Sequence, residues 1–192
     1  MAVIIRPGEG LLYMKVGTHA QETLEDIIAR KTREIENAGF ALWGYGGSTC
    51  HPISMVQPFA REYQRRGGVI FLCMQPMDSK HFAVPVRAEE FSVDGIKWQK
   101  IPAAINVLGS RYALAIKNLR REEFDLALSG TKVAIGNSMG RIGSRYVAGR
   151  VDKACLEVTE EGVTAAHGQP SVHIGLVAEI VDPYAVFVRN SG

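Results

Sequence analysis

Cysteine is scarce in this chain, and its three copies are widely spaced. Cys50, Cys73 and Cys155 are odd in number and no two of them form a C-x-x-C pair. The sequence therefore predicts neither a disulfide framework nor a cysteine-based zinc site. The five histidines also lack H-E-x-x-H or H-x-H spacing, so we expect no metal site and no bound cofactor.

Long hydrophobic runs and a strong charge of one sign are also absent. No stretch approaches the roughly 18 apolar residues of a membrane span, and residues 1–8 lack the pattern of a secretion signal. We expect a cytoplasmic protein with no membrane partner. Lysine and arginine total 22 against 20 aspartates and glutamates, a balance too even for an extended nucleic-acid track.

The composition is that of an ordinary globular protein. The chain has 192 residues, of which 46% are hydrophobic and 22% charged. A chain of this length can bury a hydrophobic core without needing disulfide bonds. We find no repeat or linker that would divide the chain into separate domains. We expect one globular domain over residues 1–192, of the α+β class, with a mostly antiparallel or mixed sheet of about eight strands and about two or three helices.

Three segments carry helical patterns. The first spans about residues 20–38, since Thr18 and Gln21 form a capping-box pattern and Gly39 can supply a left-handed end. The second begins near residue 56, because Pro58 is best tolerated in a first turn, and ends at the Gly67–Gly68 pair. A third spans roughly residues 139–149, and a short helix or turn is expected around 121–128.

The remaining apolar segments have strand patterns. Residues 69–74 are apolar without interruption, which places them in the middle of a sheet. Asp94–Gly95 is the dipeptide of a two-residue hairpin between strands 91–93 and 96–98. The other expected strands are 2–6, 11–16, 40–43, 112–116, 131–135, 151–158, 172–181 and 184–188, with Asp182–Pro183 turning the last pair.

Residues 131–145 have the pattern of an apolar strand, a glycine-rich loop and a helix. The first amides of a helix lack internal partners and can face an anion, and arginines four residues apart share one helix face. The pattern matches neither G-x-x-x-x-G-K-[ST] nor G-x-G-x-x-G, and it also fits an ordinary turn with a Ser138 cap and solvated arginines. The phosphate-binding residues predicted here are Gly136, Asn137, Ser138, Gly140, Arg141 and Arg145.

A second glycine-rich loop follows the strand at 40–43. Trp43 and Tyr45 offer aromatic faces on which a base could stack, and the loop after them offers hydroxyl and amide donors. The alternative is that Trp43 is a core residue and Tyr45 anchors the loop edge. The ligand-binding residues predicted here are Trp43, Tyr45, Gly46, Gly47, Ser48 and Thr49.

Together these patterns predict binding of a phosphate-bearing small molecule, a nucleotide or nucleotide-derived signal, without catalysis: a sensor, carrier or sequestering protein. One alternative is an enzyme acting on such a molecule with Cys50, beside His51, as its nucleophile. A nucleic-acid-binding or protein-interaction module is the second alternative. A homo-oligomer is also expected, because the apolar strands must be buried against something and a strand at the edge of the sheet can pair with a second copy of the chain.

Overall fold

A computed structural model describes residues 5–45, 52–81, 83–148, 151–160, 162–163, 165 and 168–190. The strands are β1 (Gly10–His19), β2 (Ala41–Tyr45), β3 (Ile70–His81), β4 (Glu90–Ser92), β5 (Gln99–Lys100), β6 (Tyr112–Leu126), β7 (Thr131–Val133), β8 (Lys153–Val158) and β9 (Val172–Arg189). The helices are α1 (Leu24–Ala38), α2 (Ile53–Gly67) and α3 (Gly143–Val147), with a 3-10 turn at Leu128–Gly130.

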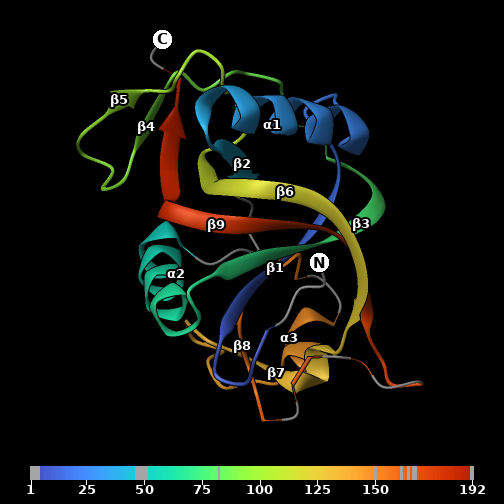
Figure 1. Cartoon of the computed structure of the whole chain (residues 1–192). Helices are drawn as coiled ribbons and strands as arrows, with labels where there is room; N and C mark the ends of the chain where they lie inside the picture. The colour runs from blue at the N-terminus through green and yellow to red at the C-terminus, as the bar shows by residue number, and fades with distance from the viewer. Residues whose placement is uncertain are drawn as a thin grey trace.

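The nine strands found among the described residues belong to one mixed sheet (Figure 1). The order is β2-β6-β9-β3-β1-β8-β7, with β4 beside β9 and β5 beside β4. Only β1 and β3 pair in parallel, and the other pairs are antiparallel. The α+β class with a mixed, mostly antiparallel sheet is therefore confirmed, and β3 lies in its interior as its continuous apolar run predicts.

Helix α1 begins four residues later than the sequence pattern suggests. Its N-cap is Thr23, whose hydroxyl accepts a hydrogen bond from the amide of Asp26 at 3.2 Å. Thr18 instead belongs to β1, so the capping box predicted from Thr18 and Gln21 is wrong. The helix ends as expected, with Gly39 in the left-handed region at φ 85°.

Helix α2 begins at Ile53, so Pro58 lies inside it and not in its first turn. The predicted start near residue 56 is thus wrong. The helix buries an apolar face that includes Val56, Phe59 and Ala60 against the sheet, and this packing outweighs the local cost of the proline. Gly68 ends the helix at φ 78°, as the Gly67–Gly68 pair predicts.

Several strands differ in length from their sequence patterns. The chain between β4 and β5 is a longer turn over Val93–Trp98, and not a two-residue hairpin. The Asp94 carboxylate organises it by accepting hydrogen bonds from the amides of Lys97 and Ile96, both at 2.8 Å, which hold the Asp94 pKa below its ordinary value. Strand β6 continues to Leu126, through most of the region expected to be a helix or turn at 121–128, and the 3-10 turn begins only at Leu128. Strand β9 continues across Asp182–Pro183.

The buried apolar side chains of the described ranges form three clusters on the two sides of the sheet. Helices α1 and α2 cover the first, α3 and β7 border the second, and the segment 101–107 closes the third against β6 and β9. Figure 1 shows α1 along the upper part of the sheet and α2 at the left. Within the described ranges, no helix is both long enough and apolar enough to cross a membrane.

Candidate functional site

The aromatic residues of the first predicted loop are part of the core. Trp43 is 4% exposed and Tyr45 1% exposed, and both belong to the cluster beneath α1 and α2. Strand β2 is covered on both faces, so neither ring offers a free face to a base, and the predicted stacking role of these two residues is wrong. The rest of that prediction, Gly46, Gly47, Ser48 and Thr49, lies outside the described residues, as do Cys50 and His51.

The second predicted loop is closed by its own backbone. The amide of Gly140 donates to the carbonyl of Val133 at 2.8 Å, and the amide of Val133 donates to the carbonyl of Arg141 at 2.8 Å. Gly136 and Gly140 have φ angles of 79° and 88°, which suits them to the turn. The bonded Gly140 amide is thus not free to face an anion, which weakens the predicted phosphate cradle.

The two arginines of this loop do not share a helix face. Helix α3 starts only at Gly143, so Arg141 precedes it and Arg145 is inside it. Both side chains are exposed. The N-cap position is Ile142, with no side-chain hydrogen bond, so Ser138 does not cap the helix and Asn137 lies in the exposed turn before it. The described geometry leaves this loop without a convergent anion site.

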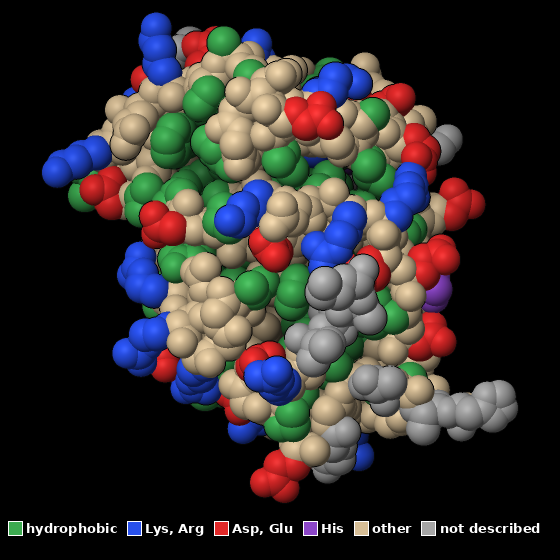
Figure 2. Space-filling view, viewed as in Figure 1, with side chains coloured by type: hydrophobic (Ala, Val, Ile, Leu, Met, Phe, Trp, Pro, Cys, Tyr) green, Lys and Arg blue, Asp and Glu red, His purple; other side chains and the backbone are tan. Residues whose placement is uncertain are grey.

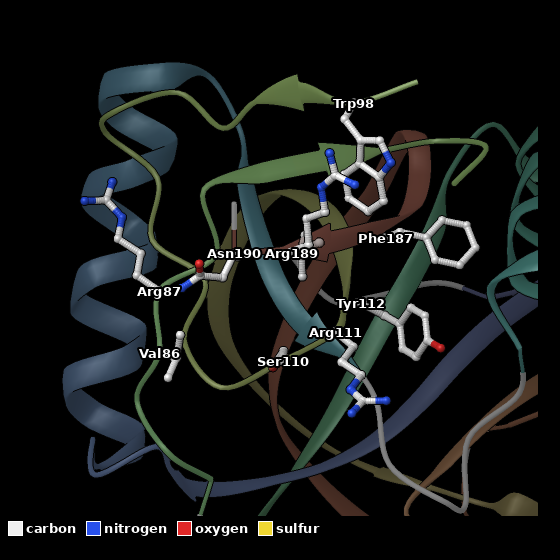
Figure 3. A pocket seen from close by; sticks show the side chains of 11 residues that line it. Val86, Arg87, Trp98, Ser110, Arg111, Tyr112, Phe187, Arg189 and Asn190 are labelled. Atoms are coloured by element: carbon white, nitrogen blue, oxygen red, sulfur yellow. The ribbon is translucent and has the colours of Figure 1, made fainter. Parts of the chain in front are cut away.

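A cavity elsewhere has the chemistry that these loops lack. It has a volume of about 390 Å³ and lies where the end of β9, the start of β6, the segment 86–88 and the β4–β5 turn meet (Figure 3). None of the described residues that line it is acidic. The lining residues are Val86, Arg87, Ala88, Trp98, Ser110, Arg111, Tyr112, Phe187, Val188, Arg189 and Asn190.

Arg189 is held in place by two neighbours. Its Nε donates to the Glu90 carboxylate at 2.7 Å, and its guanidinium carbon lies 3.9 Å from the centre of the Trp98 indole ring. Figure 3 shows the guanidinium stacked on that ring. Strand pairing explains the ion pair, because Glu90 of β4 is directly opposite Arg189 of β9. The guanidinium is therefore pre-organised, with its terminal nitrogens left for other partners.

The other two arginines differ in how they are anchored. Arg87 donates from Nη2 to the carbonyls of Ala103 and Ile105, at 3.2 and 3.3 Å, and Figure 3 shows its side chain directed toward α1. Arg111 is exposed, and no ion pair of its guanidinium is found in the described part of the chain. Arg111 is thus the guanidinium most available to an incoming anion.

Aromatic rings form one wall of the cavity. Tyr112 and Phe187 are cross-strand neighbours on β6 and β9, with ring centres 5.6 Å apart and planes at 65°. Gly95 of the β4–β5 turn passes over Phe187, since a Cβ placed there would lie 3.5 Å from the ring. With Trp98 on the same turn, the cavity combines flat apolar surfaces with positive charge.

A buried charge network holds the wall that carries Ser110 and Arg111. Lys31 and Glu34 of α1 are 3% and 2% exposed and form an ion pair at 3.0 Å. Glu34 accepts the amide of Asn106 at 2.9 Å, and both Lys31 and Arg30 donate to the Asn106 carbonyl. Burial lowers the Lys31 pKa to about 8, although the Glu34 carboxylate acts in the opposite direction.

Sequence reasoning missed this cavity because its residues come from four distant segments. In the sequence, none of Arg111, Trp98 and Arg189 belongs to a recognisable motif. Comparison of the chain with protein-family models, with curated proteins and with solved structures finds no match. Among the residues that the structure describes, no group of three or more histidine, cysteine, aspartate or glutamate side chains is placed to hold a metal ion.

Proposed function

We propose that this protein binds a phosphate-bearing small molecule, a nucleotide or nucleotide-derived signal, in the cavity of Arg87, Arg111 and Arg189. It would bind the molecule without converting it and act as a sensor, carrier or sequestering protein. One observation carries the proposal: the residues that line a single cavity include three aromatic residues, Trp98, Tyr112 and Phe187, and three arginines, of which Arg111 and Arg189 keep donors for a ligand.

Each part of such a ligand has a matching group. Guanidinium groups bind phosphate oxygens through charge-assisted hydrogen bonds, and Arg111 and Arg189 have donors for this purpose. A base needs a flat surface, which the aromatic wall supplies. The volume of about 390 Å³ is near the lower end of the roughly 300–1,000 Å³ typical of small-molecule sites, which favours a ligand of mononucleotide size.

The lining also favours binding over catalysis. General bases and nucleophiles are usually histidine, cysteine, lysine or a carboxylate, and none of these types is among the described lining residues. Ser110 and Tyr112 have hydroxyl groups, but neither has a base beside it in this lining. The enzyme alternative with Cys50 stays a prediction.

The test compares adenosine 5′-monophosphate, adenosine and inorganic phosphate by thermal shift and calorimetry. We expect the monophosphate to bind best, because it alone engages both the arginines and the rings. Arg111→Gln and Arg189→Gln should each weaken its binding by about tenfold or more, since a hydrogen bond to a charged group contributes roughly 1.5–3 kcal/mol. Arg145→Gln, which removes an exposed arginine outside the cavity, is the matched control and should bind as the unchanged protein does.

Other outcomes would redirect or overturn this proposal. If Arg141→Ala with Arg145→Ala removes the thermal shift while Arg111→Gln leaves it intact, the ligand lies in the loop of residues 136–145. Recovery of a converted ligand would support an enzyme. Salt-sensitive retention of DNA or RNA would support the nucleic-acid alternative. Figure 2 argues against that alternative, because it shows acidic and basic side chains interspersed over the visible face.

The predicted homo-oligomer is tested separately. Among the described strands, β2 lies at one end of the sheet order and β5 pairs only with β4. The outer edge of β7 is bonded to Gly140 and Arg141, so β2 and β5 are the edges that could pair with a second copy. Sedimentation velocity over a range of protein concentrations, with and without nucleotide, measures whether such pairing occurs.

A further inference from the structure

Three large apolar side chains are exposed where the loop after β7 meets the first turns of α2. Met139 is 66% exposed, and Ile142 and Met55 are each 42% exposed. Gly136 lies near two of them: a Cβ placed on it would lie 3.9 Å from the Met55 sulfur, and its carbonyl accepts the amide of Met139 at 3.2 Å. Ile142 follows Met139 three residues later in the same loop. We refer to Met55, Met139 and Ile142 as the Met/Ile patch.

The two segments that contain the Met/Ile patch carry basic residues. The two segments that form it, residues 52–61 and 134–148, contain three arginines and no aspartate or glutamate. Arg141 and Arg145 are both exposed, and in the described ranges neither takes part in an ion pair. Apolar side chains next to unneutralised guanidinium groups are therefore open to a partner.

We propose that the Met/Ile patch binds an acidic amphipathic segment of a partner protein. Apolar side chains of that segment would cover Met55, Met139 and Ile142, and its carboxylates would pair with Arg141 and Arg145. Methionine suits such a surface, because its unbranched, polarisable side chain adapts to different apolar partners. This interaction does not depend on the arginine cavity, which is a different part of the molecule.

Charge and hydrogen bonding argue against two other occupants. A second copy docked symmetrically on the same patch would bring its own arginines toward Arg141 and Arg145, and like charges repel. A free phosphate would leave the apolar side chains uncovered and would find the Gly140 amide already bonded to Val133.

The test uses a fluorescein-labelled synthetic helix of about 18 residues, roughly five turns, with leucines on one face and glutamates beside them. Fluorescence anisotropy with the full chain should show saturable binding of this peptide. A scrambled peptide of equal composition, whose leucines share no face, should bind about tenfold more weakly or worse. Met139→Ser with Ile142→Ser should weaken binding to a similar degree, because both apolar contacts are lost.

Matched variants separate the patch from general stickiness. Val93→Ser with Ile96→Ser removes two exposed apolar side chains of the β4–β5 turn, at the opposite end of the molecule from β7 in Figure 1, and should leave binding unchanged. Arg141→Glu with Arg145→Glu should abolish binding of the glutamate peptide. The same double variant should instead bind a peptide that has lysines in place of the glutamates. Such a reversal is expected only if the charges of the peptide pair directly with residues 141 and 145.

The proposal is overturned if the acidic peptide does not bind, or if the scrambled or lysine peptide binds the unchanged protein equally well. It is also overturned if Met139→Ser with Ile142→Ser abolishes self-association in sedimentation velocity, or abolishes binding to phosphatidylserine vesicles. Those outcomes would assign the patch to a second copy or to a membrane surface.

Discussion

At the scale of single residues, burial decides what an aromatic side chain can do. Trp43 lies within the short strand β2 and Trp98 directly precedes the short strand β5, but Trp43 is packed in the core whereas Trp98 is half-buried against Arg189. Sequence reasoning favoured Trp43 because a glycine-rich loop follows it. The difference lies in what each ring packs against, which the neighbouring residues in the chain do not specify.

The Lys31–Glu34 pair gives a prediction at this scale. Burial lowers the pKa of Lys31 to about 8 from 10.5, so the unfolded chain binds more protons than the folded one between these two values. The contribution of Lys31 to stability therefore increases as the pH rises through this window, by at most about 1.4 kcal/mol per pH unit. Below about pH 8 the charged form is present in both states and the slope vanishes.

The measurement is chemical denaturation of the unchanged protein and of Lys31→Met from pH 7 to 9. The free energy of unfolding of the unchanged protein should rise relative to that of Lys31→Met above about pH 8. The pH range of the measurement stops at 9 because Cys73 begins to contribute above it. Burial raises the pKa of Cys73 from 9.0 to about 12, so the thiol ionises first in the unfolded chain and the free energy of unfolding falls as the pH rises further. A constant difference across the range would show that Lys31 is not titrating as we infer.

At the scale of elements, helix ends were predicted better than helix starts. Gly39 and Gly68 end α1 and α2 because a residue without a Cβ adopts the left-handed conformation easily, which is a local property. The start of α1 was misplaced because several residues are chemically able to cap a helix, and tertiary packing selects one. The start of α2 was misplaced because Pro58 was expected in the first turn, whereas it lies inside the helix. For α1 the structure selects Thr23 and not Thr18.

This choice of cap leads to a test. Thr23→Ala should lower the free energy of unfolding by about 1 kcal/mol, since it leaves the amide of Asp26 without its hydroxyl partner. Thr18→Ala is the control for the cap predicted from sequence. Denaturant titration of both variants measures the effect, and an equal or larger loss in Thr18→Ala would contradict the assignment of Thr23.

At the scale of the whole molecule, the sheet order makes the central strands the most stable part. Strand β3 lies between β9 and β1, and its residues from Leu72 to Met74 are buried. We expect amides in β3 and the adjoining parts of β1 and β9 to exchange with deuterium at least about tenfold more slowly than those of β5 and β7. Hydrogen exchange followed by mass spectrometry measures this, and faster exchange in β3 than in β7 would contradict the order.

The sequence by itself determined the class of fold and the positions of most strands, because alternation of apolar residues, uninterrupted apolar runs and glycine stops act over a few residues. It did not determine which basic groups share a site. Arg87, Arg111 and Arg189 line one cavity because β9 pairs with β4 and β6 and because Arg87 bridges to Leu108, contacts between residues far apart in the sequence. Tertiary structure also bonded part of the loop at 136–145 to itself and to β7, since the amides of Met139, Gly140 and Arg141 have backbone partners there.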